Sequence, residues 1–329
     1  MLALGGLLVP PWASPGAAAE DFSCASDGVA VERRIPPQAT DPAIEDWLEP
    51  HIVCRDPSVP PRDSLLVHLP GSFGVPEGSR LLLREVARTG TPAIGLRYPN
   101  RWTILGLCRR SPDPECTARV REEILEGRDL SPLVRVSEAN SIRNRLRKLL
   151  QYLDGRYPQE GWGRFLREDG SVAWERVILS GHSQGGGHAA FVARRYEVAR
   201  VVMFGAPGDF VGARGNLAPW LTGPHRTPSE RYFGFAHRRD RGYPYYVQAW
   251  RALGMGAFGP SRNVDEAAPP YGGSHMLFTE ALPATGRFAG DAHGAVVRDR
   301  KTPRAPDGTP LFAPVWRYLC CAFPHEGAD

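Results

Sequence analysis

The chain has 329 residues, of which 42% are hydrophobic and 23% are charged, and its formal net charge at pH 7 is +4. This length and composition predict a sizeable buried core and exclude a peptide module or a wholly disordered protein. The small positive charge gives no reason to expect a nucleic-acid partner. With 36 glycines and 32 prolines, the chain is expected to contain many turns and long loops.

Residues 1–19 are predicted to be a signal peptide. An apolar stretch leads into small residues, with Ala17 and Ala19 in the A-x-A arrangement of a cleavage site. The stretch is interrupted by prolines and is shorter than the roughly 20 residues that span a bilayer. We therefore expect a secreted or periplasmic protein without stable membrane insertion. The alternative is an apolar tail, because the basic residues that usually open a signal peptide are missing.

The cysteines favour an oxidising compartment. There are six of them, and an even number in an exported chain indicates disulfides. Cys108 and Cys116 flank a loop that contains two prolines, and they are the first choice of pair. Cys24 with Cys54 is the second choice.

Short apolar runs alternate with helical patterns along the chain. Runs of Val, Ile and Leu without strict alternation indicate strands that are buried on both faces, as in parallel sheets. A doubly wound, mostly parallel sheet with helices on both faces is therefore predicted, which is an α/β fold. The predicted strands are 64–69, 93–98, 176–180, 200–204, 232–236 and 275–279, and the predicted helices are 79–89, 141–153 and 187–197.

Residues 20–329 are predicted to form a single domain with two insertions. The segments at about 100–140 and 241–273 are longer than simple connections, and segments of this kind often act as lids or pocket walls. Residues 241–258 are rich in aromatic side chains. They are interpreted either as an apolar pocket wall or as part of the core.

The strongest motif is Gly181-His182-Ser183-Gln184-Gly185, with two more glycines after it. A predicted buried strand comes immediately before it and a helical stretch immediately after. A sharp turn between strand and helix strains the serine backbone and exposes its hydroxyl. Flanking glycines are needed because side chains there would collide with neighbouring backbone. We therefore expect Ser183 to be a nucleophile, the alternative being a glycine-rich turn with a capping serine.

With this motif the chain resembles the α/β-hydrolases. GHSQGG is similar to the elbows of serine esterases, lipases and cutinases. The resemblance extends over about residues 60–320 in strand order, and only the elbow is specific. It implies an α/β-hydrolase-type sheet with lid-like insertions, a Ser-Asp-His triad and an ester or amide substrate.

The base is expected after the acid, in the chain order Ser, Asp or Glu, His. His293 lies in a predicted loop beyond the last apolar run, which is where this superfamily places its base. His275 opens that run and is the alternative base. The expected base takes a proton from Ser183 and later returns one to the leaving group.

The acid is expected to follow the penultimate strand. Asp240 comes soon after the strand at 232–236 and is the first candidate. Asp209, after the preceding strand, is the main alternative, with Asp265 and Asp291 behind it. The acid would set the histidine tautomer and stabilise the imidazolium.

The oxyanion hole is expected to use the backbone amide of Gln184 together with one from an early loop. The segment 68–74 fits, with Ser72 or Phe73 as the donor, although an ordinary glycine turn is the alternative. Phosphate-binding, dinucleotide-binding, zinc-protease and EF-hand motifs are missing from the sequence. The expected chemistry therefore needs no cofactor and no metal.

The predicted function is a serine hydrolase that cleaves small-molecule or lipid-like carboxylic esters through an acyl-enzyme. A peptidase or acyltransferase on the same triad is the alternative within the superfamily. A catalytically silent binding protein and a metal-dependent hydrolase are the alternatives from other classes. The sequence does not give the oligomeric state.

Overall fold

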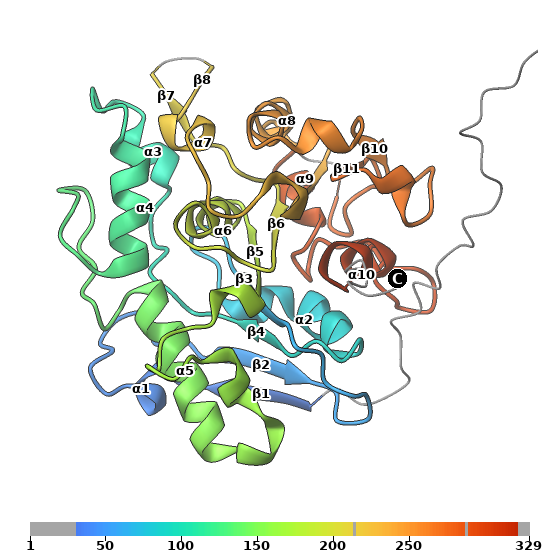
Figure 1. Cartoon of the computed structure of the whole chain (residues 1–329). Coiled ribbons are helices and arrows are strands. Elements are labelled where there is room, and N and C mark those ends of the chain that lie inside the picture. Colours follow the sequence, from blue (N-terminus) through green and yellow to red (C-terminus); the bar gives the residue numbers. More distant parts are fainter. Residues whose placement is uncertain (1–30, 213–214, 287–288, 322–329) are drawn as a thin grey trace, which may run out of the picture.

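The computed structural model describes residues 31–212, 215–286 and 289–321, so the predicted signal peptide lies outside the described residues. A nine-stranded sheet runs through the centre of the molecule, in the order β1-β2-β4-β3-β5-β6-β9-β11-β10 (Figure 1). A separate hairpin pairs β7 (Phe210–Val211) with β8 (Asn216–Leu217). The sheet strands are β1 Val31–Ile35, β2 His51–Arg55, β3 Leu65–Leu69, β4 Ala93–Gly95, β5 Val177–His182, β6 Arg200–Phe204, β9 Tyr232–His237, β10 Arg262–Asn263 and β11 Met276–Thr279.

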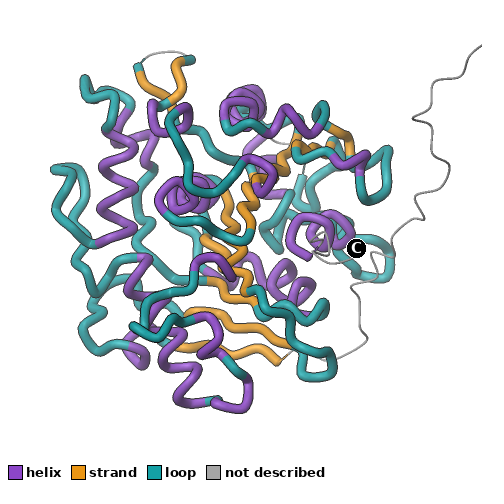
Figure 2. The backbone as a smooth tube through the Cα atoms, viewed as in Figure 1, coloured by secondary structure: helices purple, strands orange, loops and turns teal. Residues whose placement is uncertain are grey.

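The sheet is parallel from β4 through β10, while β2 runs antiparallel to β4 and β1 antiparallel to β2. Every residue of β3, β5, β6 and β9 is buried, because helices cover both faces of a parallel sheet. Figure 2 shows the strands passing between the helices. The predicted doubly wound α/β architecture is confirmed.

Helices pack on both faces of the sheet. On one face lie α2 (Arg80–Ala87) and α10 (Ala313–Cys321), and the other face carries α4 (Cys116–Glu126), α5 (Ile142–Arg156), α6 (Gln184–Arg195) and α8 (Tyr243–Ala252). The shorter helices are α1 Pro37–Thr40, α3 Ile104–Cys108, α7 Pro219–Thr222 and α9 Ala289–Ala295, and the 3-10 helices are η1 Pro76–Ser79, η2 Pro158–Glu160, η3 Trp162–Phe165, η4 Trp174–Arg176, η5 Ser229–Arg231, η6 Met255–Phe258 and η7 Tyr271–Gly273. None of the helices in the described residues is long and apolar enough to cross a membrane.

The segment predicted to be the first insertion is tied to the body of the protein. Residues 100–140 contain α3 and α4, which the disulfide Cys108–Cys116 joins, so the first-choice pairing is confirmed. Cys54 is a buried free thiol, and Cys24, its second-choice partner, lies outside the described residues. Helix α4 packs against α5 and α6.

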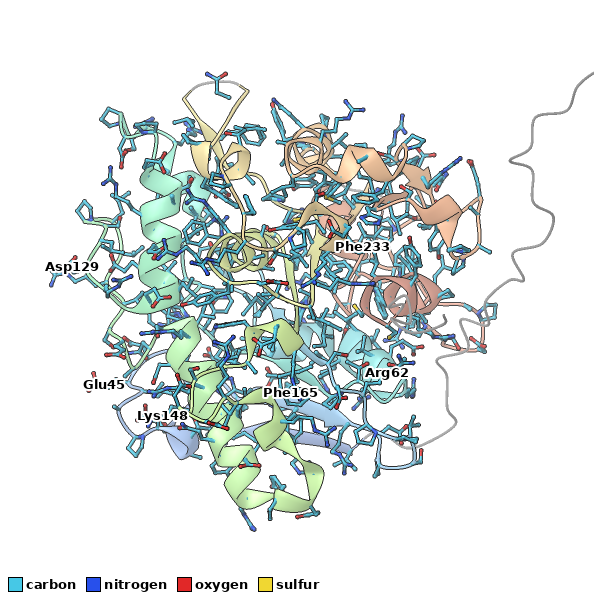
Figure 3. The ribbon with its side chains drawn as sticks, viewed as in Figure 1. Glu45, Arg62, Asp129, Lys148, Phe165 and Phe233 are labelled. Atoms are coloured by element: carbon cyan, nitrogen blue, oxygen red, sulfur yellow. A yellow bond between two sulfur atoms is a disulfide. The ribbon has the colours of Figure 1, made fainter. Side chains whose placement is uncertain are left out.

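The segment predicted to be the second insertion contributes to the core. Trp250 and Met255 are fully buried in the cluster that packs on the α6 face of the sheet. Figure 3 shows the same contrast elsewhere in the molecule, where Phe165 and Phe233 lie among packed side chains and Glu45 and Asp129 point outward. The burial of Trp250 and Met255 favours the interpretation of 241–258 as part of the core over the interpretation as a pocket wall.

Candidate active site

Ser183 occupies the turn between β5 and α6. Its backbone has φ 53° and ψ −118°, a conformation that a non-glycine residue adopts only when its surroundings enforce it. A Cβ on Gly181 would overlap the backbone of Gly185, and one on Gly185 would overlap the carbonyl of Leu69. The two glycines thus allow the tight turn, and Ser183 stays partly exposed between buried His182 and Gln184.

His293 and Asp240 form a hydrogen-bonded pair near this turn. His293 Nδ1 lies 2.6 Å from Asp240 Oδ2, and the side chains are 31% and 7% exposed. The second carboxylate oxygen of Asp240 accepts from the Gly242 amide at 2.9 Å. The carboxylate therefore engages Nδ1 and leaves Nε2 of His293 available for a partner in the cleft.

The Asp240 carboxyl is ionised at neutral pH. Burial tends to raise its pKa, but the hydrogen bond and charge interaction with His293 and the hydrogen bonds from Gly242 and Tyr246 outweigh burial and lower the pKa. An ionised carboxylate at this position stabilises a positive charge on the imidazole.

Ser183 and His293 line the same cleft, which has a volume of about 340 Å³ and is called the Ser183 cleft below. There is no direct hydrogen bond between these two described side chains. Without substrate, catalytic hydrogen bonds are often long and close only in the complex. The lining residues are Pro70, Gly71, Ser72, Phe73, Gly74, Val75, Gly78, Ser79, Thr103, His182, Ser183, His293 and Arg298.

The loop after β3 supplies one of the two predicted amide donors. The Phe73 amide donates to the carbonyl of Asn100 at 2.8 Å, so it is not available to a substrate. The Ser72 amide makes no hydrogen bond to a described residue, and Gln184, as the first residue of α6, has no intrahelical acceptor for its own amide. Of the two predicted donors in this loop, Ser72 is therefore the one whose amide remains available to a substrate.

Side-chain contacts hold these two donors together. The Ser72 hydroxyl donates to Gln184 Oε1 at 2.9 Å. The amide of buried Asn100 donates to the carbonyls of Gly71 and Gly74, at 2.7 and 2.9 Å. Asn100 was not found from the sequence, because it carries no motif and reaches the loop only through the fold.

Asp209, the main alternative acid, is committed elsewhere. Its carboxylate accepts two hydrogen bonds from Arg121, at 2.7 and 2.6 Å, and a third from Trp220 at 3.0 Å. Asp265 accepts from Thr279 at 2.6 Å, and Asp291 pairs with Lys301 at 3.0 Å. None of these carboxylates lines the Ser183 cleft.

His275, the alternative base, is part of the core. Its ring stacks between Phe233 and Phe258, with ring centroids 4.0 and 3.9 Å apart. Burial lowers the pKa of His275 to about 4. The ring does not line the Ser183 cleft.

Two further side chains support His293. His182 Nε2 donates to the backbone carbonyl of His293 at 2.8 Å, and the two rings lie 4.6 Å apart. Burial holds the pKa of His182 well below its ordinary value, so this ring is neutral. The Tyr246 hydroxyl lies 3.4 Å from His293 Nδ1. A single sequence gives no signal for such support, because both contacts depend on the tertiary packing.

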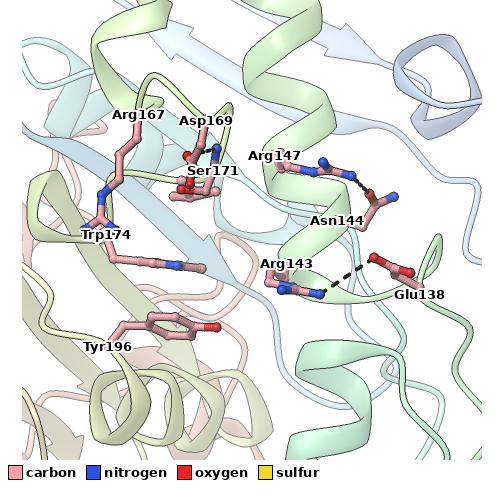
Figure 4. Close-up of a pocket in the computed structure, with 10 residues that line it drawn as sticks. Glu138, Arg143, Asn144, Arg147, Arg167, Asp169, Ser171, Trp174 and Tyr196 are labelled. Atoms are coloured by element: carbon pink, nitrogen blue, oxygen red, sulfur yellow. Dashed lines mark hydrogen bonds and ion pairs between the residues drawn. The ribbon is translucent and has the colours of Figure 1, made fainter.

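A second cavity, of about 220 Å³, lies between α5 and the segment around η4 (Figure 4). Trp174 and Tyr196 stack in it with centroids 5.0 Å apart. Its arginines have acceptors of their own, since Arg143 pairs with Glu126, Arg147 donates to Asn144 and Arg167 pairs with Glu175. No histidine or cysteine is among the described residues that line this cavity, so it holds no imidazole to activate Ser171 as a nucleophile.

No group of three or more His, Cys, Asp or Glu side chains within the described ranges could hold a metal ion.

The strand order and the elbow define the class of protein. The elbow stands at the carboxyl end of a central strand in a mostly parallel sheet, and the Asp240–His293 pair follows it in the chain. This is the α/β-hydrolase arrangement, and the chain has an α/β-hydrolase fold.

The sequence matches no protein-family model and no curated protein. Among solved structures, the chain is similar to a "putative dienelactone hydrolase" from Klebsiella pneumoniae subsp. pneumoniae MGH 78578. The identity is 15% and the TM-score 0.36, over 77% of this chain and 86% of that one. So remote a likeness transfers no function, and the fold assignment rests on the strand order and the elbow.

Proposed function

We propose that the protein is a serine hydrolase that cleaves carboxylic esters. Ser183 is the nucleophile, His293 the general base and Asp240 the acid that orients it. The observation that carries this proposal is the 2.6 Å contact between His293 Nδ1 and Asp240 Oδ2, made beside a strained, partly exposed serine in one cleft.

The first half of the reaction forms the acyl-enzyme. Ser183 Oγ attacks the ester carbonyl carbon while its proton passes to His293 Nε2. The negative charge that develops on the carbonyl oxygen is stabilised by the amides of Ser72 and Gln184. When the tetrahedral intermediate collapses, the C–O bond to the alcohol breaks and His293 gives its proton to the departing oxygen.

The second half releases the acid. A water molecule attacks the acyl carbon, His293 takes one of its protons, and the bond to Ser183 Oγ breaks as that proton returns to the serine. Asp240 keeps the imidazole in the required tautomer throughout and stabilises it when charged. The chemistry proceeds without a cofactor or metal.

The compartment and the substrate size belong to the same proposal. The disulfide between α3 and α4 supports secretion or a periplasmic location, because disulfides persist in oxidising compartments. A cleft of about 340 Å³ suits a small-molecule ester, since ligand pockets typically span ~300–1,000 Å³.

Labelling and turnover test the proposal. The purified protein should react with a fluorophosphonate probe at Ser183, located by peptide mass spectrometry, and should hydrolyse p-nitrophenyl butyrate. Ser183→Ala should abolish labelling and lower kcat by about 10⁵–10⁶-fold, because the nucleophile is lost. His293→Ala should lower kcat by a similar factor, and the double variant should be little worse than either, since triad members act as a unit.

Two controls and one contrary outcome complete this test. Circular dichroism spectra of the variants should match the parent protein. A chelator should leave turnover unchanged, because the proposed triad uses no metal. A loss of turnover would favour the metal-dependent hydrolase. Failure of the folded parent to label, with equal ester turnover in the parent and in Ser183→Ala, would favour the silent binding protein.

A further inference from the structure

The Ser183 cleft has an unbalanced charge. Apart from its two histidines, the ionisable side chain among its described lining residues is Arg298, and no aspartate or glutamate lines it. Asp240, the nearest functional carboxylate, stands behind His293 and bonds to its far ring nitrogen. A substrate that enters the cleft therefore meets a cation without a matching anion.

The guanidinium of Arg298 has no partner among the described residues. The side chain is exposed, and it makes no ion pair or hydrogen bond there. The next residue, Asp299, does not neutralise it, because its carboxylate accepts from the amides of Arg80 and Leu81 at the start of α2, both at 3.1 Å. The arginines of the second cavity, in contrast, already have acceptors. Figure 4 shows Arg143 with Glu138 and Arg147 with Asn144, and Arg167 pairs with Glu175.

The position of Arg298 is fixed by its backbone and stem. Its amide donates to the carbonyl of Gly294 at 2.8 Å, and its own carbonyl accepts from the amides of Lys301 and Thr302, at 2.8 and 2.9 Å. A Cβ placed on Gly294 would lie 3.0 Å from Arg298 Cδ. The aliphatic stem thus lies close to the residue that follows His293, and Arg298 and His293 line the same cleft.

We propose that Arg298 is a specificity-determining residue that binds a carboxylate on the substrate, so that the preferred esters are anionic ones, such as half-esters of short dicarboxylic acids. This proposal deepens the proposed function and rests on it. A guanidinium presents parallel N–H donors that match a carboxylate, and such charge-assisted pairs are stronger than neutral hydrogen bonds. The cleft contributes no carboxylate to compete with that substrate group.

Two esters with one leaving group test the specificity. Mono-p-nitrophenyl glutarate carries a carboxylate at the end of its acyl chain, and p-nitrophenyl butyrate does not. The ratio of their kcat/KM values, glutarate over butyrate, should exceed one in the parent protein. Arg298→Gln should lower that ratio about tenfold or more, and Arg298→Lys should retain part of it.

Arg300→Gln is the matched control. Arg300 is exposed, lies two residues away and does not line the cleft, so its loss changes the net charge equally and should leave the ratio as in the parent. An unchanged ratio in Arg298→Gln, or an equal fall in Arg300→Gln, would overturn the proposal.

A binding measurement separates this proposal from the catalytic one. In a Ser183→Ala background, isothermal titration with monoethyl glutarate should give a Kd that rises about tenfold when Arg298→Gln is added. This result would support the carboxylate site even if the parent hydrolysed neither ester, and the proposed function alone would then fail. An equal Kd for Ser183→Ala with and without Arg298→Gln would overturn the carboxylate site.

Discussion

At the scale of single residues, the assignment of the acid decides how the proposed base His293 would work. Asp240 accepts from His293 Nδ1, whereas Asp209 accepts from Arg121. An asparagine at 240 has nearly the same shape but presents an amide, which favours the wrong imidazole tautomer. We therefore expect Asp240→Asn to lower kcat about 10³–10⁴-fold with little change in the unfolding temperature.

Asp209→Asn supplies the contrast in the same assay. It should lower the unfolding temperature, because the buried charge of Arg121 loses its counter-charge. Steady-state kinetics on p-nitrophenyl butyrate and thermal unfolding measure the two effects. A small change in kcat for Asp240→Asn, together with a large one in folded Asp209→Asn, would move the acid to Asp209.

The sequence points to those candidate site residues whose proposed chemistry follows from local order. Ser183 stands in a motif between a strand and a helix, and chain order favours Asp240 and His293 as its partners; their catalytic roles stay a proposal. The supporting residues could not be predicted, because they act through contacts that only the fold creates. Asn100 is far in sequence from the loop it holds, and His182 supports His293 through a backbone carbonyl.

At the scale of elements, a buried ion pair connects α4 to the elbow. Arg121 on α4 donates twice to Asp209, in the segment after β6, and also to the Gln184 carbonyl at 3.1 Å. The side chains of Arg121 and Asp209 are 2% and 4% exposed. This pair fastens the first insertion to the start of α6, next to one of the proposed oxyanion donors.

Breaking this pair should destabilise the protein strongly. We expect Arg121→Met to lower the free energy of unfolding by about 3–5 kcal/mol, because Asp209 is left as a buried, unpaired charge. Arg121→Met with Asp209→Leu should recover much of the loss. Urea unfolding measures both, with Arg167→Ala as a control, since both members of its pair with Glu175 are exposed, at 55% and 47%, and the pair should barely matter. Equal midpoints for Arg121→Met and the parent would contradict a structural role for the pair.

The predicted strands match β3, β5, β6, β9 and β11 to within about two residues, a margin usual for element boundaries. Each is an apolar run that the sheet buries on both faces, so burial is written into the local sequence. The predicted strand at 93–98 is shorter in the structure and ends at Gly95. Beyond it, the amide of Arg97 donates to His51 Nδ1 rather than to a strand carbonyl.

The antiparallel edge was not predicted from the sequence. β1 carries charged residues and is largely part-exposed, so it lacks the apolar run that marks the central strands. The direction of β2 depends on pairing with β4, about forty residues away in the chain. Local patterns carry no information on such pairing, because the partners meet only in the folded sheet.

At the scale of the whole molecule, burial of histidines links stability to pH. Burial lowers the pKa of all six buried histidines in the described residues, to about 3 for His68 and to about 4 for His275. His68 and His275 are therefore neutral in the folded protein near pH 5, whereas an unfolded histidine takes up a proton below its pKa of about 6.5. Stability should therefore fall as the pH drops below about 6.5. The buried histidines are His51, His68, His182, His188, His237 and His275.

His188 isolates the effect of one such histidine. Its ring is fully buried on α6, neither ring nitrogen has a hydrogen-bond partner among the described residues, and burial holds its pKa well below the ordinary value. His188→Leu removes the titrating group without breaking a hydrogen bond. The loss of unfolding free energy between pH 7.5 and pH 5.0 should then be smaller than in the parent, by at most about 2 kcal/mol, because the unfolded variant takes up one proton fewer.

Urea unfolding at pH 7.5 and pH 5.0 measures this difference. Phe191→Leu is the matched control, because Phe191 lies on the same helix, is buried and does not titrate. It should lower stability by the same amount at both pH values. If His188→Leu lost as much stability on acidification as the parent, His188 would have to take up as much proton in the folded protein as in the unfolded protein. That result would contradict a neutral ring in the folded protein.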